Sequence, residues 1–475
     1  MLGSILQRCV SFVMLPIYTR CLTPTDYGII ELLSMVLDFV GIILGLRVGQ
    51  AIFRFYEKYD NIQDKNEVIT TSMYLVALLN LSGILLIVLS AKPLTYFVFG
   101  DYDNVFFLIL FSFTLLGQGF MEIPMTFLRA QQKPWLYIAF SMLKLALQLG
   151  LNIYFVVIRD LHVAGVIYSA LLSAATMVII LGGYTFAHTG LRASVVKAKQ
   201  LVSFSIPLVL TGIVSFYITF GDRYFLRSII GIAEVGVYSL GYKFGFILAF
   251  LVGAPFGNIW DSEKYKIHRK ENAREEYRRI FRGYNLVLFI VVVGISVFVK
   301  DLLKIMSASA FWPAANIVPI VLVAYVTNMW TGFTNLGVML EQKTIEITYG
   351  TLMAAALVTA AYLFLIPHFG AMGAAWASLL AFGTRFVWVY WRSKRLYDMG
   401  LSWKPVGVLV LLGIIAISLS YLTPDDLLVS LCLNTIIFVT SCLSLLAIPG
   451  IIPVEYRWHV MLKIKNLRYI LNCRH

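Results

Sequence analysis

The 475-residue chain has few charged residues, and this shortage excludes an ordinary soluble protein. Charged residues make up 13% of the chain and hydrophobic residues 60%, whereas soluble domains average about 25% and about 45–50%. The hydrophobic residues form continuous runs of about 20, the length of a helix that crosses a membrane. Because these runs do not alternate with polar residues, they also disfavour an outer-membrane barrel.

Cysteines and catalytic motifs are scarce as well. The five cysteines match no metal-binding spacing, so we interpret them as small hydrophobic residues. The chain has no GxxxxGK[ST] phosphate loop, no zinc-ligand spacing and no nucleophile elbow. We therefore expect a protein that is not an enzyme, binds no metal and needs no cofactor.

The apolar runs predict an all-α integral membrane protein with about 14 transmembrane helices. The expected spans are 3–19, 28–48, 68–90, 104–126, 135–158, 163–186, 201–220, 235–258, 283–300, 314–338, 347–366, 371–391, 406–421 and 427–448.

The net charge of +13 follows this topology. If the N-terminus is inside, 26 of the 38 Lys and Arg residues fall in inside segments and seven in outside segments. Lys and Arg collect in cytoplasmic loops, so both termini should be cytoplasmic, in the cytoplasmic membrane. The basic segments carry no aromatic platform or motif for nucleic acid, and we expect none to bind.

The two halves of the chain resemble each other. Three matches occur in order, at shifts of 208, 208 and 210: VAGVIYSALLSAATM (163–177) with AMGAAWASLLAFGTR (371–385), TDYGII (25–30) with AEVGVY (233–238), and RAQQKPWLY (129–137) with MLEQKTIEI (339–347). Both halves start on the same side, as in transporters built from parallel repeats.

This repeat predicts two pseudo-symmetric six-helix lobes around a central cavity, plus two C-terminal helices. The expected domains are an N-terminal lobe (1–200, spans 1–6), a C-terminal lobe (201–400, spans 7–12), extra spans 13–14 (401–452) and a basic cytoplasmic tail (453–475).

Charges inside the spans mark candidate functional residues, because a charge near the bilayer centre costs about 2.5–3.5 kcal/mol. The cations are Arg8, Arg47, Lys144, Lys243 and Arg385, and the acids include Asp38 and Glu122. We expect the deeper ones to face a cavity. Arg47, Arg385 and Glu122 lie near span ends and could instead snorkel to the interface, and Asp38 could simply neutralise Arg8 or Arg47.

Polar residues at helical spacing support a cavity. Lys144, Gln148 and Asn152 share one face of their span, and Asn328 and Asn335 lie on another span. The alternative for such residues is that they hold helices together by hydrogen bonds.

The segments LGSILQR (2–8), LPIYTRCLTPTDYGIIELL (15–33) and FGDRYFLRSIIGIAEVGVYSLGYKF (220–244), with the RAQQKP loop, resemble polysaccharide biosynthesis proteins, the O-antigen flippases. These belong to the multidrug, oligosaccharidyl-lipid and polysaccharide exporter superfamily. The resemblance implies two six-helix lobes, alternating access, and a cationic cavity that suits a lipid pyrophosphate.

The resulting hypothesis is a flippase for undecaprenyl-pyrophosphate-linked oligosaccharides. Arg8, Lys144 and Lys243 would contact phosphate, Arg47 and Arg385 would form a ring on the cytoplasmic side, and Asp38 and Glu122 would couple transport to H⁺ or Na⁺. Expected partners are the lipid-linked oligosaccharide and membrane lipids, with a polysaccharide polymerase and chain-length machinery as further possibilities.

Two alternatives remain. A drug/cation antiporter of the same superfamily should have an acid-dominated cavity, against which the excess of cations argues. A non-transporting membrane scaffold of a glycan assembly complex should tolerate neutralised cavity charges. The sequence names neither the sugar, the coupling ion nor the oligomeric state.

Overall fold

The computed structural model describes residues 14–44 and 48–447, and every regular element within them is a helix. Ten of the helices in this described part are long and apolar enough to cross a membrane. The prediction of an all-α, multi-pass membrane protein is therefore confirmed. Arg8, Arg47 and the tail 453–475 lie outside the described residues.

Three helices account for most of the remaining predicted spans, and the first of them is itself one of the ten. The 52-residue α17 (Ile345–Leu396) contains Gly370 at φ 55°, so it is two helices joined at a kink. The 35-residue α11 (Val195–Ile229) includes the predicted span 201–220. The 17-residue α18 (Lys404–Ser420) is slightly shorter than a full span.

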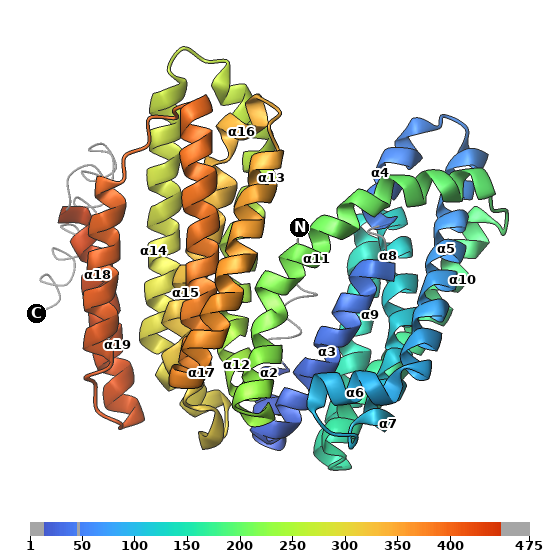
Figure 1. The fold of residues 1–475 in the computed structure, drawn as a ribbon, viewed down its shortest axis with the longest axis horizontal. Helices are drawn as coiled ribbons and strands as arrows, with labels where there is room; N and C mark the ends of the chain where they lie inside the picture. The colour runs from blue at the N-terminus through green and yellow to red at the C-terminus, as the bar shows by residue number, and fades with distance from the viewer. Residues whose placement is uncertain (1–13, 45–47, 448–475) are drawn as a thin grey trace, which may run out of the picture. The chain divides into compact units, whose positions relative to one another are not determined.

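The helices pack into two compact units. Unit 1 holds the described residues up to Leu240 together with Met306–Ala314 and Thr348–Ala381. In addition to α11, unit 1 contains α2 (Leu15–Cys21), α3 (Pro24–Leu44), α4 (Val48–Lys58), α5 (Ile62–Leu89), α6 (Ala91–Phe99), α7 (Val105–Ser112), α8 (Thr114–Ala130), α9 (Pro134–Asn152), η1 (Ile153–Ile158), α10 (His162–Thr189) and η3 (Ser309–Phe311). Helices α5, α8, α9 and α10 lie side by side (Figure 1).

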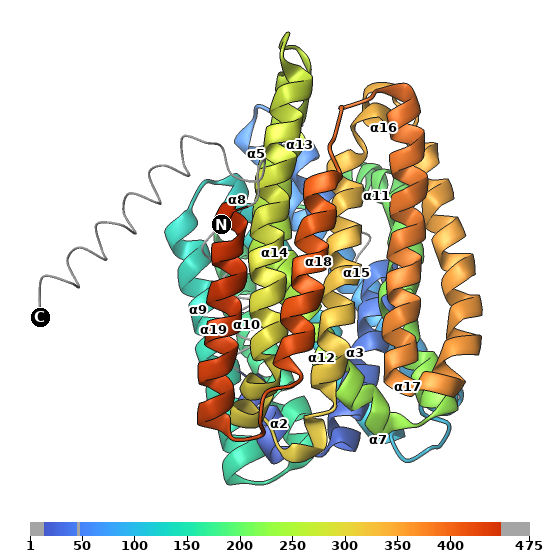
Figure 2. The same cartoon turned by 90° about the vertical axis from the view of Figure 1, so that its left-hand side faces the viewer.

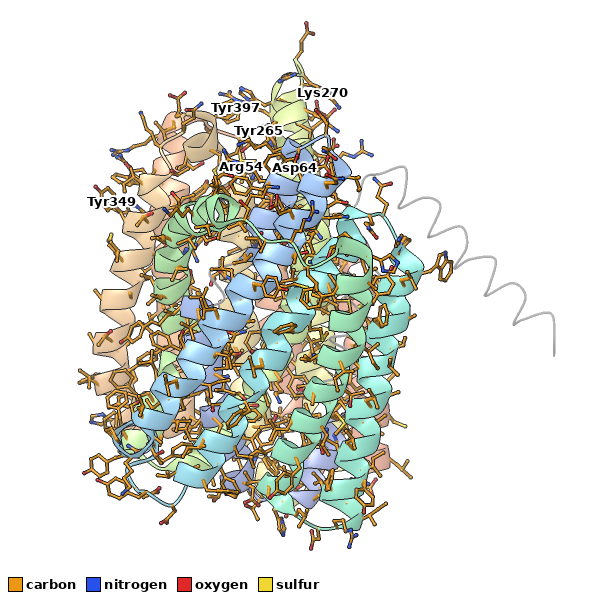
Figure 3. The ribbon with its side chains drawn as sticks, turned by 90° about the vertical axis from the view of Figure 1, so that its right-hand side faces the viewer. Arg54, Asp64, Tyr265, Lys270, Tyr349 and Tyr397 are labelled. Atoms are coloured by element: carbon orange, nitrogen blue, oxygen red, sulfur yellow. The ribbon has the colours of Figure 1, made fainter. Side chains whose placement is uncertain are left out.

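Unit 2 holds Gly241–Ile305, Ala315–Ile347 and the residues from Phe382 onward. Its helices, three of which begin or end in unit 1, are α12 (Ile232–Leu248), η2 (Ala249–Gly253), α13 (Ala254–His268), α14 (Ala273–Met306), α15 (Ala314–Thr334), α16 (Leu336–Leu340), α18 and α19 (Leu427–Ala447). Helices α14, α18 and α19 share one apolar core (Figure 2). Lys270 lies at the far tip of the α13–α14 hairpin (Figure 3).

These units do not coincide with the predicted lobes 1–200 and 201–400. In unit 1, α11, the start of α12 and the middle of α17 pack with the N-terminal half. The lobe boundaries therefore stay a prediction from the sequence repeat.

The repeat itself has a structural counterpart. Gln132 and Gln342 adopt positive φ values of 53° and 55°, 210 residues apart, in matching turns. His162 and Gly370 do the same at φ 45° and 55°, 208 residues apart. A non-glycine residue is uncommon in this conformation, so its recurrence at the predicted shifts is strong support for two related halves.

Candidate functional site

A polar cavity of about 470 Å³ lies within unit 1, enclosed by α3, α5, α8 and α11. Its polar lining comprises Asp38, Asn80, Gln118 and Glu122. Both acids predicted as coupling residues therefore face one space, although they come from helices that are distant in sequence. Among the described residues that line this cavity, none is Lys or Arg.

Helical spacing positions these acids. Gln118 and Glu122 are one turn apart on α8, and Asp38 lies one turn before the cavity-lining Ile42 on α3. The Asp38 side chain is exposed to this space. Gly49 on α4 leaves room for Glu122, because a Cβ at position 49 would collide with its carboxylate.

The remaining walls were not foreseen as parts of a site. Asn80 is 3% exposed, and its Nδ2 donates a hydrogen bond of 3.1 Å to the carbonyl oxygen of Leu115. Phe216 and Phe220 on α11 line the opposite wall with stacked rings 4.9 Å apart. A lone asparagine within the apolar run 68–90 was the available sequence signal for Asn80.

A buried polar cluster adjoins the cavity wall. Arg223 Nη1 donates to Asp222 Oδ1 at 2.9 Å, and the Tyr238 hydroxyl donates to Asp222 Oδ2 at 2.5 Å. Ser378 lies 3.4 Å from that hydroxyl. The cluster joins α11, α12 and α17 within unit 1.

Arg223 connects this cluster to the cavity through a contact with a cavity-lining ring. Its guanidinium carbon lies 4.9 Å from the ring centroid of Phe220, which lines the cavity. The sequence places Arg223 in an outside segment, and the structure shows that it is buried within unit 1, at 1% exposure.

The described predicted cations lie elsewhere. Lys144 on α9 in unit 1 and Arg385 on α17 in unit 2 are half-buried, and neither has an ion pair within the described residues. The Arg385 Nε is buried without a hydrogen-bond partner among the described residues. Lys243 on α12 is half-buried in unit 2. Their contact with a substrate stays a prediction.

The predicted polar residues have distinct surroundings. Asn152 is fully buried and accepts a hydrogen bond of 3.0 Å from the Tyr18 hydroxyl, so it joins α2 to α9. Its Nδ2 donates to the backbone oxygen of Gln148. In unit 2, Asn328 and Asn335 are half-buried, and no described residue forms a hydrogen bond with the Asn335 Oδ1.

Unit 2 contains a second, apolar pocket of about 110 Å³ between α14, α15 and α18. Its walls are Val, Leu, Ile and Phe side chains, and one end is closed by Trp330, whose Nε1 donates to Asn285 Oδ1 at 2.8 Å. Within the described ranges, no group of three His, Cys, Asp or Glu residues could hold a metal ion.

Comparison with known proteins identifies the family. The family described as "Polysaccharide biosynthesis protein" matches residues 1–259, which is more than half of the chain. This chain belongs to the polysaccharide biosynthesis protein family. No curated protein sequence matches it.

Solved structures show the fold of this family member. A lipid II flippase, MurJ, in an inward closed conformation has a TM-score of 0.74 at 9% identity, with 93% of this chain and 97% of that chain covered. An inward-facing multidrug resistance MATE family transporter of the MOP superfamily has a TM-score of 0.64 at 16% identity, covering 82% and 95%. A MATE protein in complex with MaL6 gives 0.59 at 15% identity, covering 84% and 94%. The chain thus has the all-α fold of these membrane transporters.

Proposed function

We propose that this protein is a flippase of the cytoplasmic membrane that moves undecaprenyl-pyrophosphate-linked oligosaccharides outward by alternating access, with both termini in the cytoplasm. No covalent bond changes in this process. Its family and its transporter fold support the proposal.

The observation that carries the substrate class is the pair of un-neutralised cations. Lys144 and Arg385 are half-buried within helices of membrane-spanning length, and no described carboxylate neutralises them. A buried charge needs a partner, and a pyrophosphate would supply two or three negative charges. Arginine suits such a partner because its planar fork matches phosphate oxygens.

The apolar pocket of unit 2 suits the lipid part of the same substrate. Its lining of Val, Leu, Ile and Phe residues offers no polar group to an isoprenoid chain except at the Asn285–Trp330 end. The acidic cavity of unit 1 would then serve coupling, with Asp38 and Glu122 taking up H⁺ or Na⁺. A polymerase and chain-length machinery would use the exported units.

Reconstitution tests the substrate class. Liposomes containing the purified protein and a fluorescent lipid-linked oligosaccharide should expose the sugar to a membrane-impermeant glycosidase faster than protein-free liposomes. Liposomes with denatured protein provide the control. An unchanged rate in every gradient tested would overturn the proposal.

A drug/cation antiporter of the same superfamily is the second candidate. It is favoured by the unit 1 cavity. The lining that the structure describes there includes two carboxylates and two phenylalanine rings and no Lys or Arg. The same liposomes should then accumulate a fluorescent organic cation against a proton gradient. The lipid-linked sugar should not cross the membrane.

A further inference from the structure

The first turns of α3 and α12 cross in a reciprocal contact. A Cβ at Gly28 would collide with the carbonyl oxygen of Ile232, and a Cβ at Gly236 would collide with the carbonyl oxygen of Pro24. Residues 24 and 28 become 232 and 236 by the shift of 208 that relates the two halves. The two contacts are therefore one contact seen from each side of a local pseudo-twofold axis, and all four residues belong to unit 1.

Glycine is required on both sides of this crossing. A Cβ at Gly236 would also lie 3.1 Å from the backbone nitrogen of Gly28, so the two helix backbones touch directly. Small residues allow helices in a membrane to approach this closely. Backbone atoms and the Ile232 Cγ2 atom form this contact, so separating and re-forming it requires few side-chain changes.

Each crossing helix is fastened to a turn of its own half. Asp26 Oδ2 lies 3.8 Å from His162 Nδ1, and Glu234 Oε1 accepts a hydrogen bond of 3.3 Å from the Ala371 backbone nitrogen. Residues 26 and 234 are also related by the shift of 208. Movement of one half relative to the other would therefore carry its own helix start along and part the glycine contact.

We infer that the Gly28–Gly236 crossing is a gate, which closes the side of the membrane predicted to be outer and opens when the halves rock apart. The inference rests on the proposed alternating access, but not on the identity of the substrate. An added methyl group at either glycine would oppose only the closed state. Because overpacking acts on that state alone, the closed-to-open ratio should fall.

Cysteine accessibility measures this ratio. In a variant with the native cysteines replaced by serine, Ile42→Cys places a reporter in the unit 1 cavity. Labelling by a membrane-impermeant maleimide is then compared in right-side-out and inverted vesicles. Gly28→Ala and Gly236→Ala should each raise labelling from one side roughly 5- to 150-fold, the equivalent of about 1–3 kcal/mol.

Two further variants sharpen the test. Gly183→Ala on α10 is the matched control, because no atom lies within 4 Å of the position that its added Cβ would take, and labelling should not change. Ile232→Ala removes the Cγ2 atom that lies 2.9 Å from the place of a Cβ at position 28. It loosens the crossing without a clash and should raise labelling on the same side.

The labelling result separates a gate from a packing contact. Unchanged labelling of the folded protein in Gly28→Ala and Ile232→Ala would overturn the inference, even if less protein folds. Because labelling needs no substrate, failure of sugar transport in liposomes leaves this result interpretable. A rise from the opposite side would retain the gate and reverse the predicted orientation.

Discussion

Arg223 neutralises its own chain neighbour, Asp222, inside α11, with Nη1 2.9 Å from Oδ1 and side-chain exposures of 1% and 0%. The Arg223 backbone N–H donates to the same carboxylate oxygen at 2.8 Å, and the Tyr238 hydroxyl occupies the other oxygen. Two charges removed from water are tolerated only with such close pairing. The pair therefore fixes the end of α11 against α12 beside the cavity.

Breaking this pair should destabilise the protein strongly. Asp222→Asn removes the carboxylate charge that pairs with the buried Arg223 guanidinium, and we expect a loss of about 3–5 kcal/mol in the free energy of unfolding. Arg223→Gln should have a similar effect. Thermal unfolding of detergent-purified protein measures both.

The double variant, Asp222→Asn with Arg223→Gln, provides the control. It removes both charges, so it should be more stable than either single variant. A single Asp222→Asn variant that unfolds at the wild-type temperature would show that the pair contributes little.

The buried pair also shows where the sequence was informative and where it was not. Apolar run length predicted the spans, because a membrane-crossing helix must bury its backbone within itself. The offset of 208 predicted two related halves, and the positive φ values of His162 and Gly370 at that offset support them, since backbone conformation depends largely on local sequence. Charge counting, however, gives no sign that Arg223 is buried, because its burial depends on partners in α12 that no local pattern reveals.

The candidate site was likewise only partly predictable from the sequence. The sequence selected Asp38 and Glu122, which the structure brings to one cavity. It grouped Asn152 with Lys144 by helical spacing, but the Tyr18 hydroxyl that binds Asn152 comes from a helix 134 residues away. Spacing defines the face of a helix, whereas only tertiary packing decides what that face contacts.

Lys197 should stabilise the start of α11 over a wide pH range. Its Nζ lies 2.9 Å from Asp64 Oδ1 and 2.5 Å from Glu67 Oε2, both on α5. Burial alone would lower the pKa of Lys197, but the hydrogen bonds and charges of Glu67 and Asp64 raise it above its ordinary 10.5. Because this pKa is raised, the contribution of Lys197 to the free energy of unfolding is complete below the unfolded-state pKa. It is lost as the pH rises through the folded-state pKa.

We therefore expect Lys197→Met to lower the free energy of unfolding by about 1–2 kcal/mol. A fully buried ion pair would contribute more, but Asp64 is partly exposed and solvent screens its charge. The difference from wild type should be constant between about pH 6 and pH 9 and should shrink above about pH 10.5. Lys199→Met, on the exposed face of the same helix, is the matched control. A difference that changes near neutral pH would contradict this assignment.

The cavity acids should differ in their effect on coupling. Both acids line the cavity, but Asp38 lies at the middle of its predicted span and Glu122 near the end of its own, so a change in Asp38 protonation alters the charge deeper in the membrane. Asp38→Asn should therefore slow gradient-driven transport more than Glu122→Gln. Transport by liposomes with and without an imposed proton or sodium gradient measures this, and exposed Asp103→Asn serves as the control. If transport by both cavity variants still depends fully on the gradient, neither acid takes part in coupling.

The half-buried cations should matter for substrate binding rather than for folding. Lys144 and Arg385 have no described counter-charge to lose, so Lys144→Ala and Arg385→Ala should leave the amount of folded protein unchanged. Each variant loses a charge-assisted contact to phosphate of about 1.5–3 kcal/mol, or roughly 10- to 150-fold in affinity. In cells, lipid-linked units should accumulate on the cytoplasmic leaflet, and Lys144→Arg should retain part of the activity. The control is Lys133→Ala, at the half-buried lysine just before α9, which should export normally. Normal export by Lys144→Ala at wild-type protein levels would instead make Lys144 a residue that snorkels, with no part in binding pyrophosphate.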